Sequence, residues 1–228
     1  MKKAFAFLII FVCVFALVAC GEKGTDPANE EVSNEQKIVS MIENYNVNGT
    51  SGYDYALEQT RNGVEVNSHT ITIRLDNTNE TIGSRVEYKK DLNEDITNGQ
   101  YTEISATAYY KNNRIATYEN DAWVWKNCSL SEFSSISINS FRFNFDLLTD
   151  INFTTSGQYN VLTFKIDDSN AASFLGVSKA IKNLSFEIKT DANSEKLISF
   201  TMSYSQELTS TQFKFVPYYG SVNVDLPQ

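Results

Sequence analysis

A period-two alternation of apolar and polar residues, broken at short intervals by turn residues, limits most strongly how this chain can fold. It runs from Val47 to Ile115 and resumes at Tyr159. A period of two places alternate side chains on opposite faces of a β-strand, and turn residues between such runs are typical of antiparallel hairpins. We therefore expect a meander of ten or eleven strands. The breaks in the first run are Arg61-Asn62-Gly63, Asp76-Asn77-Thr78-Asn79, Asn93-Glu94-Asp95 and Lys111-Asn112-Asn113.

Three segments depart from this pattern. Glu35 to Tyr45 and Ala171 to Asn183 carry apolar residues at helical spacing, so each is predicted to be an amphipathic helix packed on the sheet. Leu130 to Leu148 fits a broken helix or lid as well as it fits strands. A further irregularity is the change of apolar parity between residues 64 and 75, which predicts a β-bulge or bend near His69.

The amino terminus has the pattern of a secretory signal. Met1, Lys2 and Lys3 precede an uncharged run of 16 apolar residues that ends at Ala19. A spanning helix needs roughly 20 apolar residues, so a cleaved signal peptide over residues 1–19 is the better interpretation.

Leu17, Val18, Ala19 and Cys20 resemble the lipobox of bacterial lipoproteins, in which small residues precede an invariant acceptor cysteine. The resemblance implies that Cys20 becomes a lipidated amino terminus. Residues 20–34 are small, polar and acidic and are predicted to form a tether, followed by one β-rich domain over residues 35–228. The expected location is extracytoplasmic, on the bacterial cell membrane. An ordinary secretory signal with an accidental cysteine is the alternative.

The composition excludes several classes of function. Removing Lys2 and Lys3 with the signal leaves 17 basic against 28 acidic residues, a net charge of −11, which disfavours nucleic acid as a partner. His69 is the only histidine, which excludes a Ser-His-Asp hydrolase, a Cys-His protease and a multi-histidine zinc site. Cys128 is the only free thiol left, and no intramolecular disulfide can form. We predict no enzyme, no metal and no cofactor.

Aromatic residues cluster between Tyr109 and Trp125 around two short turns. Trp123 and Trp125 share a strand face, where they and nearby tyrosines would form either a ligand platform or ordinary cross-strand packing. The tyrosines concerned are Tyr109, Tyr110 and Tyr118.

The order of elements resembles the lipoprotein-carrier superfamily that includes LolA, LolB and LppX. The matching pieces are the lipobox, the first helix, the hairpins through Trp125, the Phe133 to Leu148 segment and the second helix. The resemblance implies a mainly β (α+β) fold, with the meander curled into a half-barrel, an N-terminal helix, and one or two helices on its concave face. It also implies an apolar cavity between sheet and helices. The expected lining residues are Ile104, Ala106, Ala108, Phe174, Leu175, Phe186, Ile198, Phe200 and Met202.

Two functional hypotheses follow, and a third, enzymatic one would need two carboxylates converging in a cleft. The first is a non-enzymatic envelope lipoprotein, attached to the membrane through its anchor, that binds or carries a lipid or another apolar ligand. The second is an interaction or sensor module with a filled core that binds another envelope protein through its aromatic strands. A cavity of several hundred cubic ångströms would favour the first.

Overall fold

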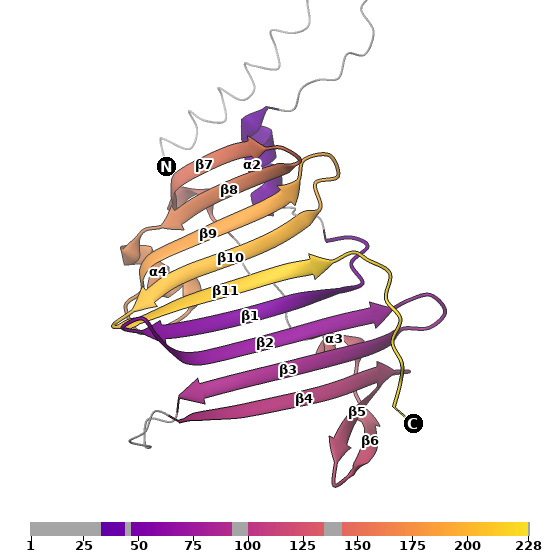
Figure 1. Ribbon diagram of the computed structural model, residues 1–228. Coiled ribbons are helices and arrows are strands. Elements are labelled where there is room, and N and C mark those ends of the chain that lie inside the picture. Colours follow the sequence, from indigo (N-terminus) through magenta and orange to yellow (C-terminus); the bar gives the residue numbers. More distant parts are fainter. Residues whose placement is uncertain (1–32, 44–46, 93–99, 135–142, 228) are drawn as a thin grey trace, which may run out of the picture. The chain divides into compact units, whose positions relative to one another are not determined.

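The computed structural model describes residues 33–43, 47–92, 100–134 and 143–227 (Figure 1). The signal peptide, Cys20 and most of the tether, all predicted from sequence, lie outside these residues. Residues 34–228 form one compact unit, and the following paragraphs concern that unit alone. None of its described helices has both the length and the hydropathy needed to span a bilayer.

One antiparallel sheet of eleven strands dominates the unit, in the order β6-β5-β4-β3-β2-β1-β11-β10-β9-β8-β7. The predicted meander is confirmed, but the half-barrel is not: the sheet is not strongly curled, and its edge strands β6 and β7 do not pair with each other (Figure 1). The strands are β1 (Gly52–Arg61), β2 (Val64–Asp76), β3 (Ile82–Leu92), β4 (Tyr101–Lys111), β5 (Arg114–Glu119), β6 (Ala122–Asn127), β7 (Leu148–Ser156), β8 (Tyr159–Ile166), β9 (Lys182–Asp191), β10 (Leu197–Gln206) and β11 (Thr209–Tyr218).

The tight turns follow from residues that tolerate positive φ. Asn112 and Asn113 have φ of 52° and 56°, and Asn120 and Asp121 have φ of 50° and 62°. Two consecutive residues with positive φ are the requirement of the hairpin turn whose twist matches that of the strands, and Asn and Asp accept it most readily. The predicted bulge is also present, because Val66 has no partner where the register between β1 and β2 shifts.

One of the two predicted helices ends earlier than expected. α2 (Asn34–Glu43) matches the first expected helix, whereas α4 covers only Asp168–Leu175. Gly176 ends α4 in the left-handed conformation, with φ of 67°, which is a common helix stop. The prediction of a helix beyond this point is therefore wrong. The segment that follows contains the buried Ile181 and the start of β9.

The ambiguous segment from Leu130 to Leu148 contains α3 (Leu130–Phe133) and a 3₁₀ turn, η2 (Phe145–Leu147). Residues 135–142 lie outside the described part. The strands on either side of this segment in sequence, β6 and β7, are the two edges of the sheet. Phe133 and Phe143, at the two ends of its described parts, both pack on the apolar face.

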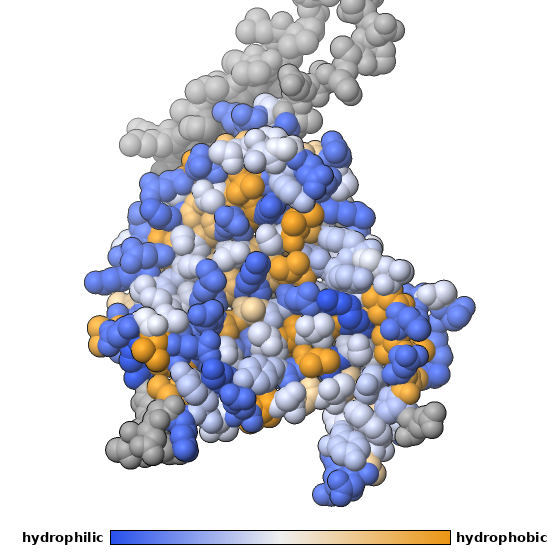
Figure 2. Space-filling view, viewed as in Figure 1, coloured by the Kyte–Doolittle hydropathy of each residue, from blue (hydrophilic) through white to orange (hydrophobic). Residues whose placement is uncertain are grey.

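Two apolar clusters lie on the same face of the sheet. We call them the large core, over β8 to β11 with α2 and α4, and the small core, over β2 and β4 with α3. Tyr53 and Tyr55 of β1 pack against both clusters and so join them. The opposite face, seen in Figure 2, is mostly hydrophilic with scattered hydrophobic residues. The buried members of the small core are Ile71, Ile73, Ala108, Tyr110 and Phe133.

Candidate ligand pocket

The strands β4 and β5 separate after only four residue pairs, and a pocket opens where they part. β4 pairs with β3 along its whole length, but it pairs with β5 only from Ala108 to Lys111. Among the described strands, none lies next to the outer edge of β4 from Tyr101 to Thr107. The short β5–β6 hairpin therefore leaves a fork at this end of the sheet.

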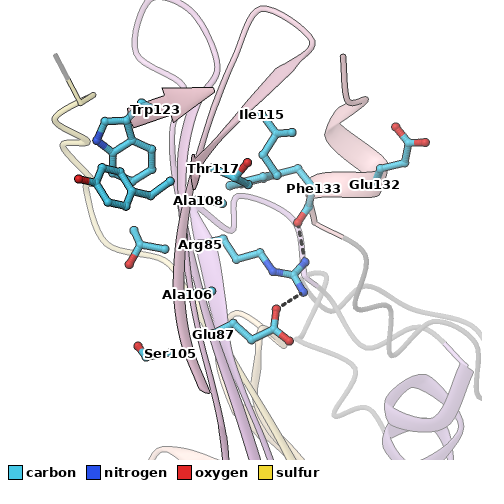
Figure 3. A pocket seen from close by; sticks show the side chains of 12 residues that line it. Arg85, Glu87, Ser105, Ala106, Ala108, Ile115, Thr117, Trp123, Glu132 and Phe133 are labelled. Atoms are coloured by element: carbon cyan, nitrogen blue, oxygen red, sulfur yellow. Dashed lines mark hydrogen bonds and ion pairs between the residues drawn. The ribbon is translucent and has the colours of Figure 1, made fainter. Parts of the chain in front are cut away.

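The pocket at this fork has a volume of about 740 Å³. Ligand pockets in proteins commonly measure roughly 300–1,000 Å³, so this one can hold a small molecule or part of a lipid. Figure 3 shows the sheet nearly edge-on, with Arg85, Ile115 and Phe133 on one side and Trp123 on the other. The lining residues are Arg85, Glu87, Ser105, Ala106, Thr107, Ala108, Ile115, Thr117, Tyr118, Trp123, Glu132 and Phe133.

Small side chains create the space on the apolar side. Ala106 and Ala108 of β4 lie directly across from Glu87 and Arg85 of β3. Because a methyl group projects only a short way from the backbone, space remains above these alanines. Longer neighbouring side chains border this space. Phe133 forms the far wall and is only 1% exposed.

Phe133 is held in place by α3, whose first turn is closed by a capping box. The Ser129 hydroxyl accepts from the Glu132 N–H at 3.2 Å, and the Glu132 carboxylate accepts from the Ser129 N–H at 2.7 Å. The hydrogen bonds that the Glu132 carboxylate accepts, from the Ser129 N–H and at 2.8 Å from the Ser129 hydroxyl, lower the pKa of Glu132 below its usual value. The Tyr53 hydroxyl also donates to the Ser134 carbonyl at 3.0 Å, so a strand in the middle of the sheet helps to fix the wall of the pocket.

A cluster of charges stands beside the apolar wall. The Glu87 carboxylate contacts His69 Nε2 at 2.8 Å, and Arg85 Nη2 and Lys89 Nζ at 3.0 Å each. Burial raises the pKa of Glu87, but hydrogen bonds from Lys89, Arg85 and His69 outweigh it and lower the pKa to about 2. Arg85 Nη1 also donates to the Phe133 carbonyl at 2.9 Å, as drawn in Figure 3. The cluster is thus joined to the wall of the pocket.

Aromatic residues occupy the other face of the fork. Trp123 makes edge contacts with Tyr109 and Tyr118, with ring centroids 5.1 and 5.3 Å apart. Tyr110 does not belong to this group, because it lies on the opposite face and packs on Phe133 at 5.3 Å. The predicted aromatic platform is therefore smaller than expected, and Tyr118 is its most exposed member at 58%.

The structure separates the nine residues predicted to line a cavity. Ala106 and Ala108 line the pocket, and Ile104, on the same strand, is exposed. The other six come from the other half of the sheet. All of them except Ile198 belong to or pack on the large core, where their side chains contact one another. That these residues bind a ligand stays a prediction. The five are Phe174, Leu175, Phe186, Phe200 and Met202, while Ile198 is half-buried and in neither core.

The sequence did contain a signal for the residues that were missed. Arg85, Glu87 and Lys89 alternate along β3, so they point to one face, and that is the face on which Ile71 and Ile73 are buried. Charged residues on an apolar face are uncommon unless they are paired or functional. Phe133 could not be placed in the same way, because it comes from the ambiguous connection.

Other candidate chemistry is sparse in the described part of the chain. No group of three or more His, Cys, Asp or Glu side chains there is arranged to hold a metal ion. Cys128 is a free, half-buried thiol, and burial raises its pKa, which makes it a poor nucleophile.

Comparison with known proteins gives structural similarity only. No protein-family model and no curated sequence matches the chain. The crystal structure of LprF from Mycobacterium bovis is similar, with a TM-score of 0.42 and 12% identity, over 86% of this chain and 97% of that one. The hypothetical protein CT021 from Chlamydia trachomatis has a TM-score of 0.29 and 13% identity, over 82% and 97%. The LolA superfamily protein NE2245 from Nitrosomonas europaea has a TM-score of 0.24 and 8% identity, over 84% and 94%.

The structures similar to this chain thus include LprF and a LolA superfamily protein. Similarity this low carries no argument about ligand, anchor or partner. What can be said of function rests on the pocket and on the sequence.

Proposed function

We propose that this protein is a non-enzymatic envelope lipoprotein, anchored to the outer face of a bacterial membrane through Cys20, that binds a lipid or another apolar ligand. The observation that carries the ligand-binding part is the pocket of about 740 Å³ at the fork between β4 and β5. Two of the residues that the sequence suggested, Ala106 and Ala108, line it. The anchor rests on the signal pattern and the lipobox alone.

In the pocket, an apolar ligand can bury surface that would otherwise contact water. Ala106, Ile115 and Phe133 present aliphatic and aromatic atoms to it, and each methylene of a bound chain that leaves water contributes about 0.8 kcal/mol. An acyl chain of several carbons could therefore bind with useful affinity without any large rearrangement of the sheet.

The ligand-binding proposal is tested by filling the pocket. The mature protein, purified in detergent from a bacterial host, is examined by native mass spectrometry for bound lipid and for added monolaurin, an uncharged amphiphile. Ala106→Trp should abolish binding, because the indole would occupy the pocket. Thr102→Trp is the matched control, since Thr102 is exposed on the same strand and the same side of the sheet but lies outside the pocket. Equal binding by both variants would overturn the assignment to this pocket.

The anchor is tested separately by intact-mass analysis of the membrane fraction. We expect cleavage before Cys20 and the added mass of a diacylglyceryl group. An uncleaved chain, or a free thiol at Cys20, would remove the anchor while leaving the pocket experiment intact.

The interaction module remains a second candidate, favoured by the exposed outer edge of β4 and by the exposed Tyr118 beside Trp123. An open strand edge can pair with an extended segment of another chain. This candidate predicts that the protein purified from every host has the mass of the ligand-free chain. The native mass spectrometry of the pocket experiment measures this mass as well.

A further inference from the structure

A row of charged side chains on one face of β3 begins inside the pocket and continues beyond it. Arg85 and Lys89 carry positive charges, and Glu87 between them and Asp91 after them carry negative ones. With His69 neutral the row has no net charge, in a protein whose formal net charge is −9.

The cluster is part of the pocket because of the strand register. Arg85, Glu87 and Lys89 lie directly across from Ala108, Ala106 and Ile104 of β4. Arg85 and Glu87 line the pocket, while Lys89 continues the same row along the face. A molecule lying along β4 would therefore meet methyl groups and the Phe133 ring at one end and charged groups at the other.

The charged groups differ in how far they are already engaged. Arg85 is mostly buried, and it donates both to Glu87 and to the Phe133 carbonyl. Lys89 is 45% exposed, and an ammonium group has three donors, of which the contact with Glu87 uses one. Lys89 can thus contact a further anion without releasing Glu87.

We propose that the ligand of this pocket is an anionic amphiphile, with its chain against Ala106, Ile115 and Phe133 and its carboxylate or phosphate head beside Lys89 and Arg85. This inference rests on the proposed function and specifies its ligand. Because Glu87 is already surrounded by cations and Asp91 accepts from Asn67, the groups left to bind a head are the further donors of Lys89, which favour an anionic head over a cationic or uncharged one. Glu132, the other carboxylate of the pocket, is bound to Ser129 in the capping box on the far wall.

The test compares three probes that share a twelve-carbon chain. Laurate carries a carboxylate, monododecyl phosphate carries a phosphate, and monolaurin is uncharged. Binding to the mature protein is measured by native mass spectrometry at pH 8 and low ionic strength. We expect at least one anionic probe to bind about fivefold more tightly than monolaurin. A partly exposed charge contact contributes about 1 kcal/mol, which corresponds to this factor. The stronger of the two anions then identifies the headgroup.

Two variants at adjacent positions provide the matched control. Lys89→Gln removes the exposed cation of the row and should bring the anionic probes down to the affinity of monolaurin. Lys90→Gln removes the same charge from the opposite face, where Lys90 pairs with Glu65 at 3.2 Å, and should leave the preference unchanged.

The outcomes separate this inference from the function on which it rests. Binding of monolaurin as tightly as the anionic probes, or an equal effect of both lysine variants, would overturn the anionic ligand while the apolar pocket stands. Failure of all three probes to bind would instead overturn the proposed function.

Discussion

The two ends of the sheet are built differently, although they share one apolar face. Over β8 to β11, α2 and α4 cover a dense group of side chains in which Phe164, Phe186 and Phe200 are at most 2% exposed. Over β2 to β5 the short α3 is the only described helix on the sheet, Ala106 and Ala108 leave space, and a row of charges replaces apolar residues. The difference indicates that the large core supplies stability, while the small core can give up packing for a pocket.

The sharpest way to break this comparison is to remove one large side chain from each end. Phe200 is fully buried and contacts Phe186 and Phe213 at centroid distances of 6.1 and 5.9 Å. Phe200→Ala should lower the free energy of unfolding by about 3–5 kcal/mol. Ile115→Ala, at the half-buried pocket wall, should cost about 1 kcal/mol, since less of its surface leaves water. Denaturant unfolding measures both, and equal losses would contradict the comparison.

A second change tests whether the small core is nonetheless tightly fitted at one point. A Cβ atom at Gly83 would lie 2.7 Å from Phe133 Cε1 and 2.9 Å from Leu75 Cδ2. Gly83→Ala should therefore displace the wall of the pocket and cost about 1–3 kcal/mol of stability. Ser84→Ala, whose side chain is on the other face, is the control. Wild-type stability in Gly83→Ala would show that α3 is loosely held.

The smallest expected effect concerns the charge cluster and depends on pH. The pKa of Glu87 is lowered from 4.5 to about 2 in the folded state, so its stabilisation is present above pH 4.5 and is lost as the pH falls from 4.5 to 2. Glu87→Gln should therefore cost about 1–2 kcal/mol at pH 7 and almost nothing near pH 2.

Glu103→Gln, which changes an exposed carboxylate on β4, serves as the reference for this measurement. Unfolding of the three proteins is compared at pH 7 and pH 2. A Glu87→Gln effect that is the same at both values would show that the charge of Glu87 is not what stabilises the cluster.

Much of the fold could be predicted from local pattern. The turns at Asn112 and Asn120, the bulge near His69 and the first helix follow from backbone preferences and from apolar spacing, which act over a few residues. The second helix was predicted too long, because the apolar residues after Gly176 fit helical spacing equally well. The left-handed conformation of that glycine ends the helix.

The pocket could be predicted only in part. Ala106 and Ala108 were included because they alternate on a strand, but the fork depends on where β5 leaves β4, and no local pattern records that position. Phe186 and Phe200 were expected beside a cavity, yet aromatic residues on an apolar face serve equally well to fill it. Which of the two occurs depends on how closely α4 and Phe143 approach the sheet.

The pairing of β1 with β11 joins the beginning and the end of the domain at the centre of the sheet. Gln59 and Thr211 hydrogen-bond across this seam although they are 152 positions apart. The five strands β2 to β6 can therefore assemble on β1 early, but the other side of β1 has no partner until β11 has been synthesised. Forming contacts between such distant segments has a large entropic cost of chain closure, and this cost slows folding. The seam thus makes synthesis of β11 a condition for a continuous sheet.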